Sequence, residues 1–290
     1  MKKLAGILAG VLGSALLAGG PVLAGGDSPA AAPKAAPPDP FKVHSQIIIP
    51  ELNSGDAEQV KAGLDDLSNW LKADSSDREE ILGLLVQTKH FADLDDLARK
   101  MILADPSDSG QIGQVEAVIV RSYIAQKKPQ EALSAARVYY NICPLYDTSR
   151  AISLVSLCLA KARPDQAGLI RRFKKQQIEG GNAQPAPGPA SQPAQADNIL
   201  LGIPIDPKPW AKAIDDITTD DFKSYVAKGN LLLLAGRTKE ALENFKQAYE
   251  IAEDDQSAEA VENEARALRA DSGTVGPANA FITRVRNGQE

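Results

Sequence analysis

The stretch Phe222–Glu253 reads FKSYVAKGNLLLLAGRTKEALENFKQAYEIAE and decides the fold. Its centre, Ala235-Gly236, predicts a tight turn between two helices. Three apolar residues in the second half are spaced by four and three residues, which places them on one helix face: Ala241, Phe245 and Ala248. In the first half, Gly229 lacks a side chain and would let the second helix approach closely. The stretch therefore predicts a helical hairpin.

Earlier parts of the chain carry weaker copies of this helix–turn–helix pattern. Gly113–Pro144 fits the same frame, with Ala132 in the second helix and a proline at its end. Ser75–Pro106 fits more loosely, Thr148–Ile178 is weaker still, and Ile47–Ala73 reads as a half-copy. Units of this size that recur along a chain predict stacked helical hairpins.

The pattern resembles the tetratricopeptide repeat (TPR), a hairpin of about 34 residues with small and bulky residues at fixed positions. In the Phe222–Glu253 copy, Gly229 matches the glycine of the repeat, and Glu253 stands where a proline usually ends the unit. The resemblance implies an all-α fold in which antiparallel helix hairpins stack as a TPR-like solenoid, with a disordered Pro/Ala-rich linker. An irregular helical bundle would show the same periodicity and is the structural alternative.

The first segment of the chain predicts export. Residues 1–24 combine Lys2 and Lys3, an apolar run from Leu4 to Leu17, and the small-residue site Val22-Leu23-Ala24. This is the pattern of a signal peptide, so we expect an exported protein of a bacterial envelope, periplasmic or secreted. A retained membrane anchor is the alternative, but the apolar run is short for a bilayer span.

Two segments rich in proline and alanine predict linkers, because they cannot bury enough apolar area to fold. They are residues 25–41 and residues 180–198, the second of which is also rich in glutamine. Between them, residues 42–179 are expected to form TPR-like helical repeats. Residues 199–290 are expected to form a C-terminal helical region with one TPR copy and capping helices. Alternatively, this C-terminal region folds back and completes the stack of the first repeats.

The composition and the motifs argue against several classes of function. The 38 acidic and 32 basic residues give a net charge of -6, whereas nucleic-acid binding needs a cationic surface. His44 and His90 have no second histidine or cysteine at helical spacing, and His90 reads as an exposed turn residue. No motif for nucleophilic, metal or phosphate chemistry occurs. We therefore expect no catalytic residues, no metal, no cofactor and no enzyme activity.

One loop resembles a calcium-binding motif. Residues 105–116 place Asp105 first, Gly110 sixth and Glu116 twelfth, as in the loop of an EF-hand. Serines occupy the third and fifth positions, where Asp or Asn normally supply oxygen ligands. Pro106 also fits as the final residue of a repeat, which explains the loop without calcium. A calcium site is the weaker of the two interpretations.

Cys143 and Cys158 leave two alternatives open. An exported chain permits a disulfide between them. Cys158 reads equally well as a small buried hydrophobic residue, because it falls at a core-facing position of its helix. The Cα separation decides between a bridge and two buried thiols.

The resemblance also implies a groove for partners. In repeat stacks, the first helix of each hairpin lines a concave surface that binds extended peptides or helices. The partner-binding positions would be Lys223, Asn230, Leu233, Gln114 and Arg121. Some members of the family grip a peptide's C-terminal carboxylate there, but Val226 stands where the lysine of that clamp would be. We therefore expect peptide binding without a complete carboxylate clamp.

Together these features predict a non-catalytic protein–protein interaction scaffold of the bacterial cell envelope. Its partners would be other envelope proteins or peptides, without nucleic acid and without an integral membrane span once the signal peptide is removed. The alternative is an accessory ligand-binding or enzymatic envelope protein whose site lies in the C-terminal region. The pattern does not specify an oligomeric state.

Overall fold

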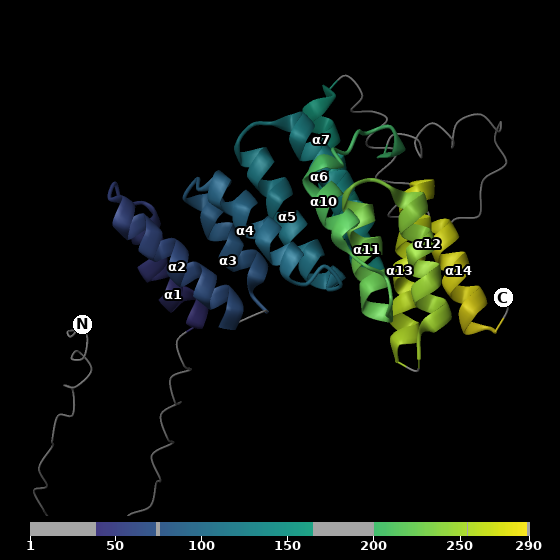
Figure 1. Cartoon of the computed structure of the whole chain (residues 1–290). Helices are drawn as coiled ribbons and strands as arrows, with labels where there is room; N and C mark the ends of the chain where they lie inside the picture. The colour runs from purple at the N-terminus through teal and green to yellow at the C-terminus, as the bar shows by residue number, and fades with distance from the viewer. Residues whose placement is uncertain (1–38, 74–75, 165–199, 254, 289–290) are drawn as a thin grey trace, which may run out of the picture. The chain divides into compact units, whose positions relative to one another are not determined.

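The part of the chain that the structure describes consists mainly of α-helices (Figure 1). The structure, a computed structural model, describes residues 39–73, 76–164, 200–253 and 255–288. No β-strand occurs in these ranges, so the predicted all-α class is confirmed. The predicted linker at 180–198 lies outside them, and the first helix begins at Pro40, so it includes the last two residues of the other predicted linker, 25–41.

The N-terminal helices, in chain order, are α1 (Pro40–Leu52), α2 (Ala57–Ala73), α3 (Arg78–Gln87), α4 (Phe91–Ala104), α5 (Ser109–Ala125) and α6 (Pro129–Ile142). A 3-10 turn, η1 (Leu145–Asp147), leads into α7 (Thr148–Ala162). The C-terminal helices are α10 (Lys208–Asp216), α11 (Phe222–Leu234), α12 (Thr238–Ile251), α13 (Gln256–Ser272) and α14 (Gly276–Arg286).

The hairpin predicted from Phe222–Glu253 is formed by α11 and α12. Asp221 caps α11, because its carboxylate accepts a hydrogen bond from the backbone N–H of Ser224 at 2.7 Å. The Ser224 hydroxyl in turn interacts with the backbone N–H of Asp221, which completes a capping box. Gly236 then turns the chain in the left-handed conformation, with φ 72°.

Gly229 allows the two helices of this hairpin to approach closely. A Cβ added to Gly229 would lie 2.2 Å from a ring carbon of Phe245, which is fully buried in α12. The ring therefore occupies the space that any side chain at this position would need. The close approach predicted for the glycine is confirmed.

We predict that Gly229→Ala lowers the free energy of unfolding by about 1–3 kcal/mol, because the added methyl group overpacks the contact with Phe245. Gly83→Ala is the matched control. Gly83 also lies within a helix, but a Cβ there meets nothing within 4 Å, so this change should stabilise the chain by about 0.5–1 kcal/mol. Urea unfolding measures both. Equal effects of the two substitutions would contradict the packing argument.

Three of the hairpins share one turn geometry. The residue in the left-handed conformation is Lys89 between α3 and α4, Lys127 between α5 and α6, and Gly236 between α11 and α12. The next residue in each turn donates its backbone N–H to the carbonyl five positions earlier: His90 to Leu85 at 2.8 Å, Lys128 to Tyr123 at 3.0 Å, and Arg237 to Leu232 at 2.8 Å. This is the Schellman arrangement, which satisfies carbonyls at a helix end.

The C-terminal helices pack on the N-terminal ones. α6 contacts both α11 and α13, and the described residues from Asp39 onward belong to one compact unit. One buried apolar cluster joins Leu94 and Ile112 of the N-terminal helices to Leu231 and Phe245 of the C-terminal region. Of the two arrangements that the sequence leaves open, the structure has the C-terminal region folded back onto the earlier helices.

Two buried arginines on α13 hold the end of α6. Arg266 and Arg269 are 1% and 0% exposed. Arg266 Nη1 donates to the carbonyl of Ile142 at 2.8 Å, and Arg269 Nη2 donates to the carbonyl of Cys143 at 3.0 Å. The last carbonyls of a helix lack intrahelical partners and carry partial negative charge. The guanidinium groups therefore supply both hydrogen bonds and compensating charge at this contact.

Candidate functional site

A pocket of about 370 Å³ lies where α4, α5 and α6 meet α10, α11 and the segment before α10. Its apolar wall includes Ile102, Ile119, Ala135, Val138, Ile205, Pro209, Trp210 and Leu234. Its polar lining includes Asp95, Arg99, Glu116, Tyr123, Glu131, Ser134 and Asp206. The pocket thus forms between the N-terminal helices and the folded-back C-terminal region. Its described lining combines an apolar wall with four carboxyl groups and one guanidinium group. Convergent polar groups in an apolar pocket are typical of ligand sites.

Glu116 on α5 is the most strongly perturbed group in this pocket. Only 5% of the residue is exposed, and no hydrogen bond to its carboxyl group forms within the described part of the chain. Burial raises the pKa of Glu116 from 4.5 to about 8, and the negative charge of Asp95 acts in the same direction. Because an isolated charge is costly in a low-dielectric site, Glu116 is mainly protonated at neutral pH.

Asp95 on α4 shares the pocket. Its Oδ1 atom is buried and has no hydrogen-bond partner among the described residues. Burial raises the pKa of Asp95, whereas the positive charges of Lys128 and Arg99 act in the opposite direction. Burial together with the surrounding acidic groups also raises the pKa of Tyr123. The pocket therefore contains two carboxyl groups whose hydrogen-bonding capacity is unfilled.

The sequence carries a partial signal for this site. Glu116 stands between Val115 and Ala117 in an otherwise apolar run, which indicates a buried carboxyl group. The calcium-loop interpretation gives that residue a different role. Asp95 carries no such signal, because Asp96 follows it directly and the pair reads as an exposed helix face.

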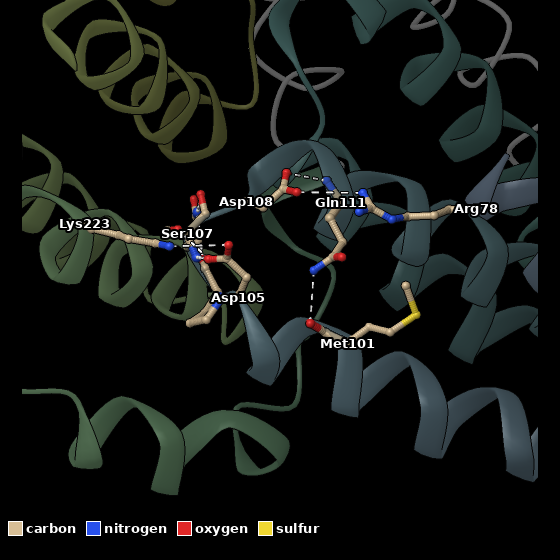
Figure 2. Close-up of polar contacts among 9 residues, drawn as sticks. Arg78, Met101, Asp105, Ser107, Asp108, Gln111 and Lys223 are labelled. Carbon is tan, nitrogen blue, oxygen red and sulfur yellow. Dashed lines mark hydrogen bonds and ion pairs between the residues drawn. The ribbon is translucent and has the colours of Figure 1, made fainter. Parts of the chain in front are cut away.

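Figure 2 shows the turn between α4 and α5, the segment whose sequence resembles a calcium-binding loop. Asp105 accepts hydrogen bonds from the hydroxyl of Ser107 at 2.6 Å and its backbone N–H at 3.3 Å, and it lies 3.5 Å from Lys223 Nζ. The Ser107 hydroxyl is the main cause that lowers the pKa of Asp105. Asp108 accepts from the backbone N–H of Gln111 at 2.8 Å and so caps α5.

The turn does not have the geometry of a calcium-binding loop, the weaker of the two interpretations of this segment. α5 begins at Ser109, so positions five to twelve of the predicted loop are helical. Glu116 lies inside that helix and lines the pocket described above. Asp105 instead accepts the hydrogen bond from Ser107 that stabilises the turn. The described ranges contain no group of three or more His, Cys, Asp or Glu side chains that could hold a metal ion. The carboxylates of this turn serve local structure.

The groove residues predicted on α11 contact the chain itself. Asn230 is fully buried, and its Nδ2 donates to the carbonyls of Pro106 at 3.0 Å and Ser107 at 3.3 Å. Leu233 is fully buried in the apolar cluster. Lys223 is exposed beside the same turn. The expectation that Asn230 and Leu233 line an open groove is therefore wrong, because the folded-back arrangement covers both residues.

Gln114 and Arg121 do line an open hollow, of about 360 Å³, together with Glu79 of α3 and Arg150 of α7. Glu79 Oε2 accepts from Arg121 Nη2 and from Arg150 Nη2, each at 2.5 Å. The side chains of Arg121 and Arg150 remain 43% and 45% exposed. Three helices that are separated in sequence thus bring two guanidinium groups onto one carboxylate.

Both cysteines are buried as free thiols. Cys143 Sγ lies 3.6 Å from Arg269 Nη2 at the contact between α6 and α13. Burial raises the pKa of Cys158 to about 11. Of the two alternatives that the sequence leaves open, the structure has the buried, unbridged thiols.

His90 is not the exposed turn residue that the sequence suggests. Its Nδ1 lies 3.0 Å from Asp93 Oδ2, and its Nε2 lies 2.8 Å from the carbonyl oxygen of Leu52. The ring therefore links the turn between α3 and α4 to the last residue of α1. The sequence gives no signal for this contact, because Leu52 belongs to a different hairpin.

Within the part of the chain that the structure describes, no helix has both the length and the apolar character needed to cross a membrane. No protein-family model, curated protein or solved structure matches this chain.

Proposed function

We propose that this chain is a non-catalytic interaction scaffold of the TPR type, which binds an extended segment of a partner protein in the hollow lined by Gln114 and Arg121. The proposal includes export to a bacterial periplasm or beyond it, directed by residues 1–24, which lie outside the described residues. It also includes the stacking of hairpins as a solenoid, in which first helices line the binding face.

The shared turn geometry supports the repeat component of this proposal. Lys89, Lys127 and Gly236 occupy the same place in three hairpins, with the same backbone hydrogen bonds around them. A lysine gains nothing from the left-handed conformation, which only glycine adopts at low cost. Recurrence of that conformation at lysine therefore favours a common architectural unit over three unrelated turns.

The observation that carries the binding proposal is the sharing of Glu79 by two arginines. Arg121 and Arg150 both donate to one carboxylate oxygen of Glu79, and both remain nearly half exposed. A guanidinium has five N–H donors, so each retains donors for a further acceptor. The Oε1 atom of Gln114 is buried without a hydrogen-bond partner in the described ranges. These groups suit the carbonyl, carboxylate and N–H groups of an extended peptide.

Site-specific photocrosslinking in intact cells tests this proposal. We expect a photoreactive amino acid at position 114 to yield one reproducible protein adduct in the native envelope. Arg121→Glu combined with Arg150→Glu should reduce this adduct by about tenfold or more, because two charge-assisted contacts are lost and repulsion from Glu79 is added. The recovered mature chain should begin at Gly25 if residues 1–24 are removed on export.

Two controls distinguish loss of binding from loss of structure. The photoreactive group at Arg284, which is exposed on α14, should not give the same adduct. The double variant should retain the helical circular dichroism of the wild type. Its free energy of unfolding should lie within about 1 kcal/mol of the wild-type value, which is the effect expected for surface ion pairs. An adduct that persists at wild-type yield in the folded double variant would rule out this hollow as the binding site.

A further inference from the structure

We propose that the pocket containing Asp95 and Glu116 is a second binding site, which accepts a cationic amine carried on an apolar stem. The proposal does not depend on the peptide-binding hollow, which is formed by α3, α5 and α7 instead. The two carboxyl groups would hold the ammonium group, and the apolar wall would cover the stem.

The first argument is the unfilled hydrogen-bonding capacity of the pocket. Glu116 is 95% buried, since only 5% of it is exposed, and no described residue donates to it. Asp95 Oδ1 is likewise buried without a partner in the described ranges. Buried polar groups are normally paired, and an unpaired one costs free energy. A primary ammonium brings three N–H donors, enough to satisfy both carboxyl groups at once.

The second argument is the charge of the lining. Glu131 and Asp206 add two further carboxylates to the pocket, whereas Arg99 is the only cationic side chain among its described lining residues. Lys128 lies outside this lining, although its positive charge acts on Asp95. This excess of acidic groups attracts a cation and opposes an anion. The lining therefore favours a cationic ligand and disfavours ligands that carry a carboxylate or a phosphate.

The third argument is the apolar wall. Ile119, Val138 and Trp210 face the same space as the carboxyl groups. A bare, strongly hydrated ion would gain nothing from these side chains, whereas an alkyl stem would be removed from water against them. A volume of about 370 Å³ falls in the range of sites for small organic ligands. The chemistry fits an alkylamine or the side chain of a lysine.

Calorimetry of the full chain with three probes tests the proposal. We expect n-pentylamine to bind at least about tenfold more tightly than 1-pentanol, which has the same stem without the charge. Capped lysine, Nα-acetyl-lysine N-methylamide, distinguishes the sources of the amine. Binding of n-pentylamine but not of capped lysine identifies a free amine, and the opposite result identifies a lysine side chain of a partner. Failure of both amines to bind would overturn the proposal.

Proton release gives a readout that is specific to Glu116. At pH 7 this group is mainly protonated, and a bound ammonium stabilises its ionised form, so binding should release a proton. Affinity should therefore rise between pH 6 and pH 8.5. The other titratable or charged groups among the described lining residues are Asp95 and Arg99 of α4, Tyr123 of α5, Glu131 of α6, and Asp206 before α10. Lys128, before α6, acts on Asp95 through its charge. Titrations in two buffers that differ in ionisation enthalpy measure the released proton.

Isosteric variants complete the test. Glu116→Gln mimics the protonated acid, so the fold should be retained while proton release disappears and amine affinity falls about tenfold or more. Asp95→Asn should weaken binding similarly. Asp66→Asn, an exposed position on α2, is the matched control and should bind as the wild type does. Wild-type affinity in both pocket variants, or equal binding of pentanol and pentylamine, would refute the site.

Discussion

Replacing Arg269 with alanine is expected to lower the free energy of unfolding by roughly 3–5 kcal/mol. The Arg269 side chain is fully buried, and its guanidinium donates to the carbonyls of Tyr140 and Cys143 and to the hydroxyl of Thr148. The same group lies 4.9 Å from the centre of the Tyr140 ring. Truncation removes these donors where water cannot replace them and opens a cavity between α6 and α13.

Two further variants define the cause of this loss. Arg284→Ala, at an exposed position on α14, should change the free energy of unfolding by less than about 0.5 kcal/mol. Arg269→Lys should recover only part of the stability, because one ammonium cannot reproduce the planar fork that reaches Thr148 and the α6 carbonyls together. Urea unfolding followed by circular dichroism measures all three. A loss below about 1 kcal/mol for Arg269→Ala would contradict the proposed anchoring role.

The position of Arg269 also predicts how the chain unfolds. Its contacts join α13 to residues more than a hundred positions earlier in the chain, so its loss weakens the docking of the C-terminal region. Trp70 lies in α2 and Trp210 in α10, and both are largely buried. Two variants, Trp70→Phe and Trp210→Phe, each keep a single tryptophan, whose fluorescence reports on unfolding of its own region. With Arg269 present, the two variants should unfold in coincident transitions. When Arg269→Ala is added to each, the two transitions should separate if docking is lost first.

The hairpins could be predicted because their determinants are local. Gly229 and Phe245 meet within a single hairpin, and the spacing of small and bulky residues records that contact directly. The turn at Gly236 was recognisable for the same reason. The equivalent turns at Lys89 and Lys127 were not, because lysine gives no indication of a left-handed conformation.

The docking of the C-terminal region could not be predicted, because its determinants are distant in sequence. Arg266 and Arg269 stand in a charged, alanine-rich helix and read as solvent-exposed, yet they are buried against carbonyls of α6. Asn230 matched a partner-binding position of the repeat, but its partners are the carbonyls of Pro106 and Ser107 in this same chain. A polar residue that fits a binding pattern can therefore serve an intramolecular contact, and the sequence does not separate the two uses.

The pocket illustrates the same limit. In the sequence, Glu116 reads as the twelfth residue of a calcium-type loop, whereas its apolar neighbours are typical of a buried position. Ile205 and Trp210 line the same pocket as Glu116, but in the sequence they follow residue 199, far from Glu116. No local pattern relates these residues to α5, so only the three-dimensional arrangement identifies the site.

Glu116 should make the stability of the chain depend on pH in a defined direction. Below pH 4.5 its carboxyl group is mainly protonated in both the folded and the unfolded chain, so its ionisation does not change the free energy of unfolding. Between pH 4.5 and about 8, the unfolded chain ionises this group while burial keeps it protonated in the folded chain. The unfolded state is therefore favoured progressively as the pH rises. The interval between the two pKa values corresponds to a loss of at most roughly 4–5 kcal/mol.

Glu116→Gln isolates this contribution from every other titrating group. The amide keeps the shape of the protonated acid but cannot ionise in the unfolded chain, so the variant should not share the loss. Urea unfolding of both proteins at pH 5 and pH 8.5 gives the difference, with Asp66→Asn as the control for a change of one exposed carboxylate. We expect the variant to gain stability over the wild type as the pH rises. A difference that is the same at both pH values would mean that Glu116 is solvated in the folded chain, and the argument for an unpaired buried acid would fail.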